Sequence, residues 1–179
     1  MVRGVRLTDD VIELRPPLKA DAEELYLAVQ ESLAALLPWM AWAHPAYSEL
    51  DATEWIRRAA RAFNDGQEFH FVARSISSGE LLGVIGLNGI DRLNRWGNLG
   101  YWVRTSCQGR GYVTRAARLV SGFGLSELNL GRIEILAAVA NTRSQAVADR
   151  AGAIREGVAR RRLRVGDDIQ DAVVYSIVS

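Results

Sequence analysis

A glycine-rich stretch at residues 107–114 constrains this chain most, because it joins a strand-like run at 99–103 to an amphipathic segment. Gly109 and Gly111 stand one residue apart, and glycine lets backbone amides approach a bulky group closely. Past them, apolar residues recur with the period of one helix face, which leaves Arg115, Arg118 and Ser121 toward solvent. A helix beginning here offers unpaired N–H groups at the positive end of its dipole. The stretch therefore predicts a phosphate-binding loop, and the simpler alternative is a tight turn that needs glycine only for its conformation.

A second polar motif follows about thirty residues later, after another strand-like run at 132–140. Asn141 and Ser144 are spaced as Asn-x-x-Ser, and a helical segment then ends in the run Ala-Gly-Ala-Ile-Arg-Glu-Gly at 151–157. Read locally, Asn141 caps the helix and Ser144 lies in its first turn, which is a common use of both residue types.

Taken together, these motifs resemble those of the GCN5-related N-acetyltransferase superfamily. The matching runs are Gly-Tyr-Trp-Val at 100–103, Gln-Gly-x-Gly-Tyr at 108–112, Asn-x-x-Ser at 141–144 and the 151–157 run. Within the superfamily the chain is most similar to the RimJ/RimL-type ribosomal-protein N-acetyltransferases, and the resemblance extends over residues 11–178. It implies acetyl-CoA as cosubstrate, an amine as acceptor, no metal, and a cofactor site in a notch where two parallel central strands splay apart.

The order of the expected elements predicts an α/β (α+β) fold. Strands are expected at 11–15, 69–74, 81–87, 98–103, 132–140, 154–165 and 169–177, with helices after residues 19, 51, 112 and 142. Asp51 and Glu54 are the expected capping box of the second helix, and residues 166–168 the last turn. The strand at 132–140 follows a helical crossover, so it should lie parallel to the strand at 98–103. The result is a mixed, mostly antiparallel sheet of about seven strands with helices on both faces, as in the GNAT fold.

Length and charge limit the remaining classes. The 179 residues fit one domain, 1–179, in which the polar residues 1–10 are a flexible lead-in. A net charge of +1 gives no electrostatic reason to expect nucleic acid or an anionic membrane as partner. No apolar run is long enough to span a bilayer. The single cysteine, Cys107, and an N-terminus without a signal-peptide core favour the cytoplasm.

The resemblance assigns roles to individual residues of the motifs. The main-chain groups of Tyr101, Trp102 and Val103 would bind pantetheine, and the Val103 N–H would polarise the thioester carbonyl. Asn141 would hydrogen-bond pantetheine, and Ser144 would protonate the departing thiolate. The expected phosphate-binding residues are Gln108, Gly109, Arg110, Gly111, Tyr112 and Val113, the last of which stands where the family has Gly or Ala.

No general base is evident. The two positions at which relatives carry a carboxylate hold Asn98 and Leu163, neither of which accepts a proton. The remaining titratable candidates, each equally an ordinary surface or strand-end group, are Glu68, His70, Glu134, Asp168 and Asp171. Without a base, chemistry is easiest on a peptide α-amine, whose pKa of about 7.7 to 8.0 leaves it partly neutral, whereas lysine lies near 10.4. The expected acceptor is therefore the N-terminal α-amine of a protein or peptide, attacking directly in a ternary complex.

The acceptor site is the least determined part. Trp39, Trp42 and His70 are the candidate acceptor-binding residues, although aromatic residues beside prolines also pack loops onto a core. The basic run 160–164 would steer an acidic acceptor or be a solvated strand face. Covalent catalysis by Cys107 is disfavoured, because no histidine partner is evident. Open alternatives are a small amine or antibiotic as acceptor, another acyl-CoA such as succinyl-CoA, and a non-catalytic acyl-CoA-binding module. A homodimer is expected from the resemblance alone.

Overall fold

The computed structural model of the chain describes residues 4–165 and 168–179, and it contains an eight-stranded sheet in the order β1-β2-β3-β4-β5-β6-β8-β7. The strands are β1 (Leu7–Thr8), β2 (Ile12–Arg15), β3 (Phe69–Ser75), β4 (Leu81–Asp91), β5 (Trp96–Val103), β6 (Arg132–Ala138), β7 (Ile154–Val165) and β8 (Asp168–Val178). The helices are α1 (Ala22–Leu36), α2 (Glu49–Asn64), α3 (Tyr112–Ser126) and α4 (Thr142–Ala151), with short 3-10 turns η1 (Lys19–Asp21) and η2 (Thr105–Cys107). Every neighbouring strand pair is antiparallel except β5 and β6. The predicted mixed, mostly antiparallel α/β fold is confirmed.

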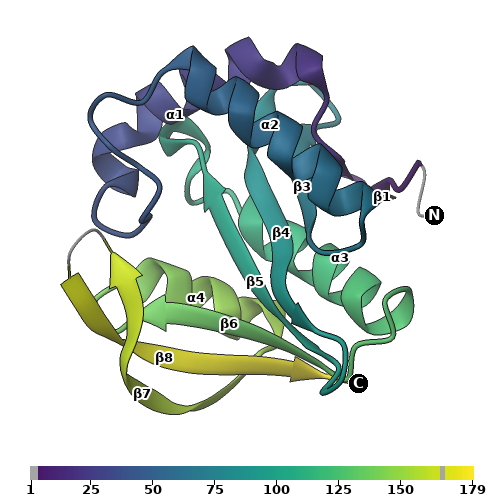
Figure 1. Cartoon of the computed structure of the whole chain (residues 1–179), viewed down its shortest axis with the longest axis vertical. Helices are drawn as coiled ribbons and strands as arrows, with labels where there is room; N and C mark the ends of the chain where they lie inside the picture. The colour runs from purple at the N-terminus through teal and green to yellow at the C-terminus, as the bar shows by residue number, and fades with distance from the viewer. Residues whose placement is uncertain (1–3, 166–167) are drawn as a thin grey trace.

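Helices cover both faces of the sheet, as expected (Figure 1). The alternation of side chains along β3 explains the two layers. Phe69 and Phe71 pack in one hydrophobic cluster with Phe123 of α3. Val72, which points to the opposite face, packs in a second cluster with residues of α1 and α2 such as Leu25. Sequence periods of 3.6 and 2 thus produce one helix–sheet–helix sandwich.

The central parallel strands part soon after they meet. In the described part of the chain, β5 pairs with β6 only where residues 96–98 oppose 132–134. Beyond Asn98, β5 continues to Val103 paired with β4 alone. The backbone edge of residues 99–103 is consequently left without β6 as a partner, and this is the predicted splay.

Two local predictions were wrong. Residues 7 and 8 belong to β1 rather than to a flexible lead-in, because they pair with β2. The turn that follows is held by the Asp9 carboxylate, which accepts the Val11 and Ile12 N–H groups. Ser121 is 2% exposed instead of facing solvent, since α3 is covered on this side too.

The capping box of α2 lies three residues earlier than predicted. Ser48 is the N-cap, its hydroxyl accepts the Asp51 N–H, and the Asp51 carboxylate accepts the Ser48 N–H at 2.8 Å. The helix therefore begins at Glu49. The predicted turn at 166–168 lies mostly outside the described residues, and Asp168 is the first residue of β8.

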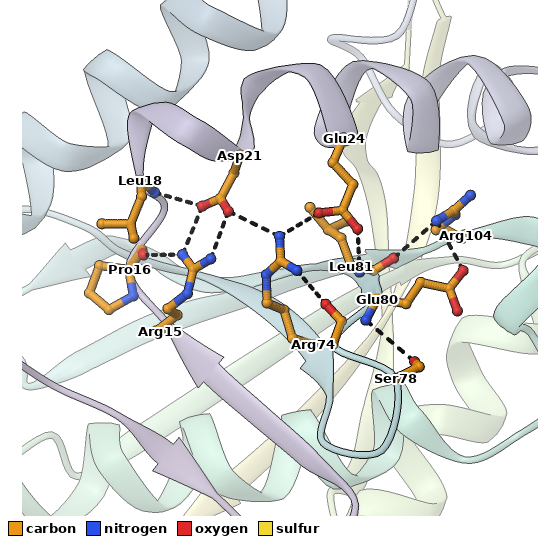
Figure 2. Close-up of polar contacts among 11 residues, drawn as sticks. Arg15, Pro16, Leu18, Asp21, Glu24, Arg74, Ser78, Glu80, Leu81 and Arg104 are labelled. Atoms are coloured by element: carbon orange, nitrogen blue, oxygen red, sulfur yellow. Dashed lines mark hydrogen bonds and ion pairs between the residues drawn. The ribbon is translucent and has the colours of Figure 1, made fainter.

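Carboxylates along one edge of α1 tie this helix to the strand ends (Figure 2). Asp21, the residue before α1, accepts two hydrogen bonds from the Arg15 guanidinium at 2.6 and 2.7 Å and a third from Arg74. Glu24, one helical turn later, pairs with Arg74 and accepts the Leu81 N–H at 2.8 Å. The position of α1 over the sheet is therefore set by charge-assisted hydrogen bonds as well as by its apolar face.

Candidate functional site

A cavity of about 690 Å³ opens beside the free edge of β5. Its walls come from β5, from the loop leading into α3, from the first turn of α3, from α4 along its length, and from the end of α1. The lining residues that the sequence predicted are Trp39, Tyr101, Trp102, Val103, Gln108, Gly109, Gly111, Tyr112, Val113, Asn141 and Ser144. The structure therefore brings motifs far apart in the sequence to one place.

The loop before α3 has the conformation for which glycine is suited. Gly109 and Gly111 have φ values of 75° and 78°, in the left-handed region that glycine adopts without a steric cost. Gly111 is the N-cap of α3, and its carbonyl accepts the Arg115 N–H at 3.1 Å. The N–H groups of residues 112–114 precede this first helical bond, and all three residues line the cavity. Converging amides at the positive end of a helix are suited to hold a phosphate group.

Tyr101 and Ser144 link the two sides of the splay. The two hydroxyl oxygens lie 3.0 Å apart, and the Tyr101 hydroxyl also donates to the Ser144 carbonyl at 3.1 Å. Burial raises the pKa of Tyr101 to about 12, so its hydroxyl remains protonated at neutral pH. The Asn141 side-chain oxygen accepts the Ser144 N–H at 3.1 Å, which is the predicted local capping role. These bonds fix the Ser144 hydroxyl at the cavity wall.

The cavity is also lined by two arginines of α4, and the sequence analysis did not single out either of them. Arg143 donates to the Gln108 side chain at 2.9 Å and so joins α4 to the glycine loop. Arg150 lies two helical turns later on the same side of the helix. Arg143 and Arg150 are seven residues apart, which places them on one face of a helix, and this spacing is the signal that would have paired them. Arg110, by contrast, is exposed and is not among the lining residues.

The predicted acceptor residues are separated in the structure. Trp39 lines the cavity together with Ala35, Leu36 and Met40 at the end of α1. Trp42 lies outside it and packs against Trp102, with the ring centroids 6.0 Å apart. His70 is not a lining residue either, since it lies on β3 in contact with Glu68, with 2.9 Å between Nε2 and Oε2.

The remaining candidate bases are placed away from the cavity. Glu134 accepts from Arg132 at 3.0 Å, Asp171 accepts the Arg161 N–H at 2.8 Å, and Asp168 is exposed at the start of β8. Among the described residues no Asp or Glu lines the cavity.

The basic run 160–164 lies on the edge strand β7, and the buried Cys107 lines the cavity. Within 4–165 and 168–179, no three His, Cys, Asp or Glu side chains gather as a metal site, and no helix could cross a membrane.

A splayed parallel strand pair with a glycine loop and a helix N-terminus beside it is the arrangement expected of an acyl-CoA-dependent N-acetyltransferase. The chain belongs to the acetyltransferase (GNAT) domain family, whose model matches residues 12–154.

Named relatives agree with the predicted resemblance to the RimJ/RimL type. A Bacillus subtilis (strain 168) protein, YdaF, provisionally named a ribosomal N-acetyltransferase, is 34% identical over 88% of this chain and 86% of its own length. The ribosomal-protein-serine acetyltransferase of Escherichia coli (strain K12) is 27% identical over 98% of this chain and 97% of its own. Among solved structures, the microcin C7 self-immunity acetyltransferase MccE, in complex with acetyl-CoA and AMP, superposes with a TM-score of 0.88 at 28% identity, covering 96% and 94% of the two chains.

Proposed function

We propose that the protein transfers an acetyl group from acetyl-CoA to the N-terminal α-amine of a protein or peptide. The cavity carries the first half of the proposal. Its glycine loop and the first-turn amides of α3 suit the phosphates of acetyl-CoA, and the free edge of β5 suits the pantetheine amides, which can pair with it as an added strand does.

Two groups of this chain are suited to the bond changes at the thioester. The acceptor nitrogen attacks the thioester carbonyl carbon, the C–S bond breaks, and the sulfur leaves as thiolate. The Val103 N–H donates to the carbonyl oxygen as negative charge develops there. The Ser144 hydroxyl gives its proton to the sulfur and regains one from water, and the acceptor nitrogen loses its proton to water. Asn141, whose side-chain oxygen already accepts the Ser144 N–H, keeps its NH₂ group for the pantetheine.

The α-amine is supported by what lines the cavity and by the names of the relatives. A lysine acceptor would have to lose a proton at a cost of about 4 kcal/mol at neutral pH, and the cavity lining described above holds no carboxylate to take it. An α-amine is already partly neutral. YdaF and the E. coli relative are both named for ribosomal substrates. The proposal includes a cytoplasmic location and a homodimer, and sedimentation of the purified protein tests the homodimer.

The deciding experiment is thiol release from acetyl-CoA with a panel of acceptors. The acceptors are peptides beginning with Ser or Ala, the same peptides blocked at the N-terminus but carrying a lysine, the polyamine spermidine, and an aminoglycoside. Succinyl-CoA is tested separately as an alternative donor. We expect turnover with the free α-amine peptides and none with the blocked ones. A preference for lysine or spermidine would contradict the α-amine. Binding of acetyl-CoA by calorimetry without turnover of any acceptor would favour a non-catalytic binding module.

A further inference from the structure

The sheet face beneath α1 and α2 carries in-register rows of side chains across β3, β4 and β5. The row that reaches the cavity is apolar and consists of Val72, Val84 and Trp102. The next row consists of His70, Gly86 and Gly100. The row after that contains Asn88 and Asn98, with Glu68 directly before β3. Since side chains two residues apart share a face, His70 lies one row from the Trp102 wall of the cavity.

The two glycines let polar groups approach this middle row. A methyl group at Gly86 would overlap His70 Nδ1 and would lie 2.8 Å from the Phe69 carbonyl oxygen. The imidazole therefore leans from β3 across β4, in the direction of β5. At Gly100, the nearest atoms to an added methyl would be Asn88 Nδ2 at 3.5 Å and Asn98 Nδ2 at 4.0 Å. An imidazole and two amides thus surround a strip of sheet that has no side chains of its own.

The contacts of His70 leave one of its two ring nitrogens free to accept a proton. Nε2 lies 2.9 Å from Glu68 Oε2, and the Trp55 ring of α2 packs edge-on at 5.7 Å between centroids. A carboxylate on one nitrogen places the proton there and leaves the lone pair of the other as an acceptor. Nδ1, over Gly86, is that acceptor. Glu68 is the titratable group in contact with His70, because α2 faces it with Trp55 and β4 with Gly86.

Asn98 supplies an independent observation on the neighbouring polar row. Its Nδ2 donates to Asn88 Oδ1 at 3.0 Å, while its Oδ1 is buried and accepts no hydrogen bond from any described residue. A buried acceptor without a donor is costly, so this row contains a polar group that the chain itself leaves without its full set of hydrogen bonds. Asn98 itself takes no proton. His70 is the group of these rows that can take one and that faces the strip.

We propose that His70, oriented by Glu68, is the proton acceptor for the acetyl-transfer reaction, acting through one water beside the Asn98 amide nitrogen. As the acceptor nitrogen forms its bond to the carbonyl carbon, its proton passes to the water and a water proton passes to Nδ1. The resulting imidazolium is stabilised by the Glu68 carboxylate. The sulfur leaves with the C–S electron pair and takes its proton from Ser144, and the imidazolium returns a proton to Ser144 through water. This inference rests on the proposed function and names the group that completes it.

The test compares His70→Gln with His44→Gln, because the chain has two histidines and His44 is exposed in the loop between α1 and α2 rather than on the sheet. Steady-state rates with acetyl-CoA and the Ser-initiated peptide are measured from pH 5.5 to 9, and acetyl-CoA affinity by calorimetry. We expect kcat of His70→Gln to fall about 100-fold at pH 7 with unchanged acetyl-CoA affinity. The fall in wild-type activity at low pH, where imidazoles take up a proton, should disappear in His70→Gln and persist in His44→Gln.

A second variant keeps the proposal testable if His70→Gln folds poorly. Glu68→Gln removes the anion that favours the imidazolium, so the low-pH loss of activity should move to lower pH while the acetyl-CoA affinity stays the same. A kcat of His70→Gln within threefold of wild type with the same pH profile would overturn the His70 assignment alone. An inactive wild type would instead overturn the proposed function on which the assignment rests.

Discussion

The Tyr101 hydroxyl lies 3.0 Å from the Ser144 hydroxyl, and this contact joins β5 to α4 across the point where β5 and β6 part. Because burial raises the pKa of Tyr101 to about 12, the phenol is a hydrogen-bond donor throughout the physiological range. The phenol donates to the Ser144 carbonyl, and its oxygen lies within hydrogen-bond distance of the Ser144 hydroxyl. The pair therefore has the geometry of a proton donor and its positioning neighbour.

Replacing Ser144 by Ala is expected to lower kcat about 10- to 100-fold with little change in acetyl-CoA affinity, because only the proton for the leaving sulfur is lost. Tyr101→Phe should give a smaller decrease, since the Ser144 hydroxyl remains but loses its partner. The double variant should lose less than the product of the two single effects, because both residues act on one proton. Single-turnover rates check this, and fully multiplicative losses would show that the two hydroxyls act separately.

The turn that leads into the glycine loop is held from α1. Glu31 accepts the Ser106 N–H and an Arg104 N–H, each at 2.9 Å, and the hydroxyl of its neighbour Ser32 accepts the Thr105 N–H at 3.0 Å. Burial opposes ionisation of Glu31, but these hydrogen bonds outweigh it and hold the pKa of the carboxyl below its usual value. The start of the phosphate-binding loop therefore depends on a helix whose last turn lines the same cavity.

Glu31→Gln is expected to weaken acetyl-CoA binding about fivefold, because a neutral amide holds Arg104 and the η2 amides less firmly. The value of kcat should change less than twofold, since no group at the thioester is altered. Glu23→Gln, on an exposed position of the same helix, is the matched control. Calorimetric titration with acetyl-CoA measures both. Equal affinities for the two variants would show that α1 does not position the loop.

Gly111→Ala separates backbone strain from loss of the ligand site. A methyl group there meets no atom within 4 Å, so packing is unaffected, but a φ of 78° costs an L-residue about 1–2 kcal/mol. We expect a loss of about 1 kcal/mol in the free energy of unfolding and a larger loss in acetyl-CoA affinity, because the methyl group lies where the phosphates approach. Gly79→Ala, with φ 71° in the β3–β4 turn and equally open space, is the control. Denaturant unfolding and calorimetry separate the two effects. Equal affinities for the two variants would contradict the phosphate assignment.

The sequence predicted those parts of the fold and site that depend on local chemistry and spacing. The glycine loop, the Asn141 cap and the alternating strands follow from residue type and period. The splay was predicted through the resemblance. Ser121 was misplaced because a 3.6-residue period locates the centre of a buried face but not its width. The capping box was misplaced because Asp51 plays the third-residue role as readily as the N-cap role.

Contacts between distant segments were not predictable. Arg143 with Gln108, and Tyr101 with Ser144, are separated by 35 and 43 residues and meet only when the parallel strands diverge. His70 lies next to Gly86 because of strand register, which alternation alone does not fix. These are the contacts that complete the site, so the least predictable part of the molecule is also the part that bears most on its chemistry.

Asp21 provides the last prediction, on acid stability. It is 2% exposed and accepts hydrogen bonds from Arg15, Arg74 and the Leu18 N–H (Figure 2). Burial alone would raise the pKa of its carboxyl, but these bonds outweigh burial and hold the pKa below the usual 3.8. A depressed pKa means that the contribution to stability is present above about pH 4 and is lost as the pH falls through the folded-state value.

Asp21→Asn should therefore cost about 3 kcal/mol at pH 7, since it leaves two arginines underpaired, and its unfolding free energy should vary less with pH below 4 than that of the wild type. Urea unfolding between pH 2.5 and 7 measures both, with Asp65→Asn on the exposed end of α2 as control. An acid dependence unchanged from the wild type would show that other carboxylates govern acid unfolding.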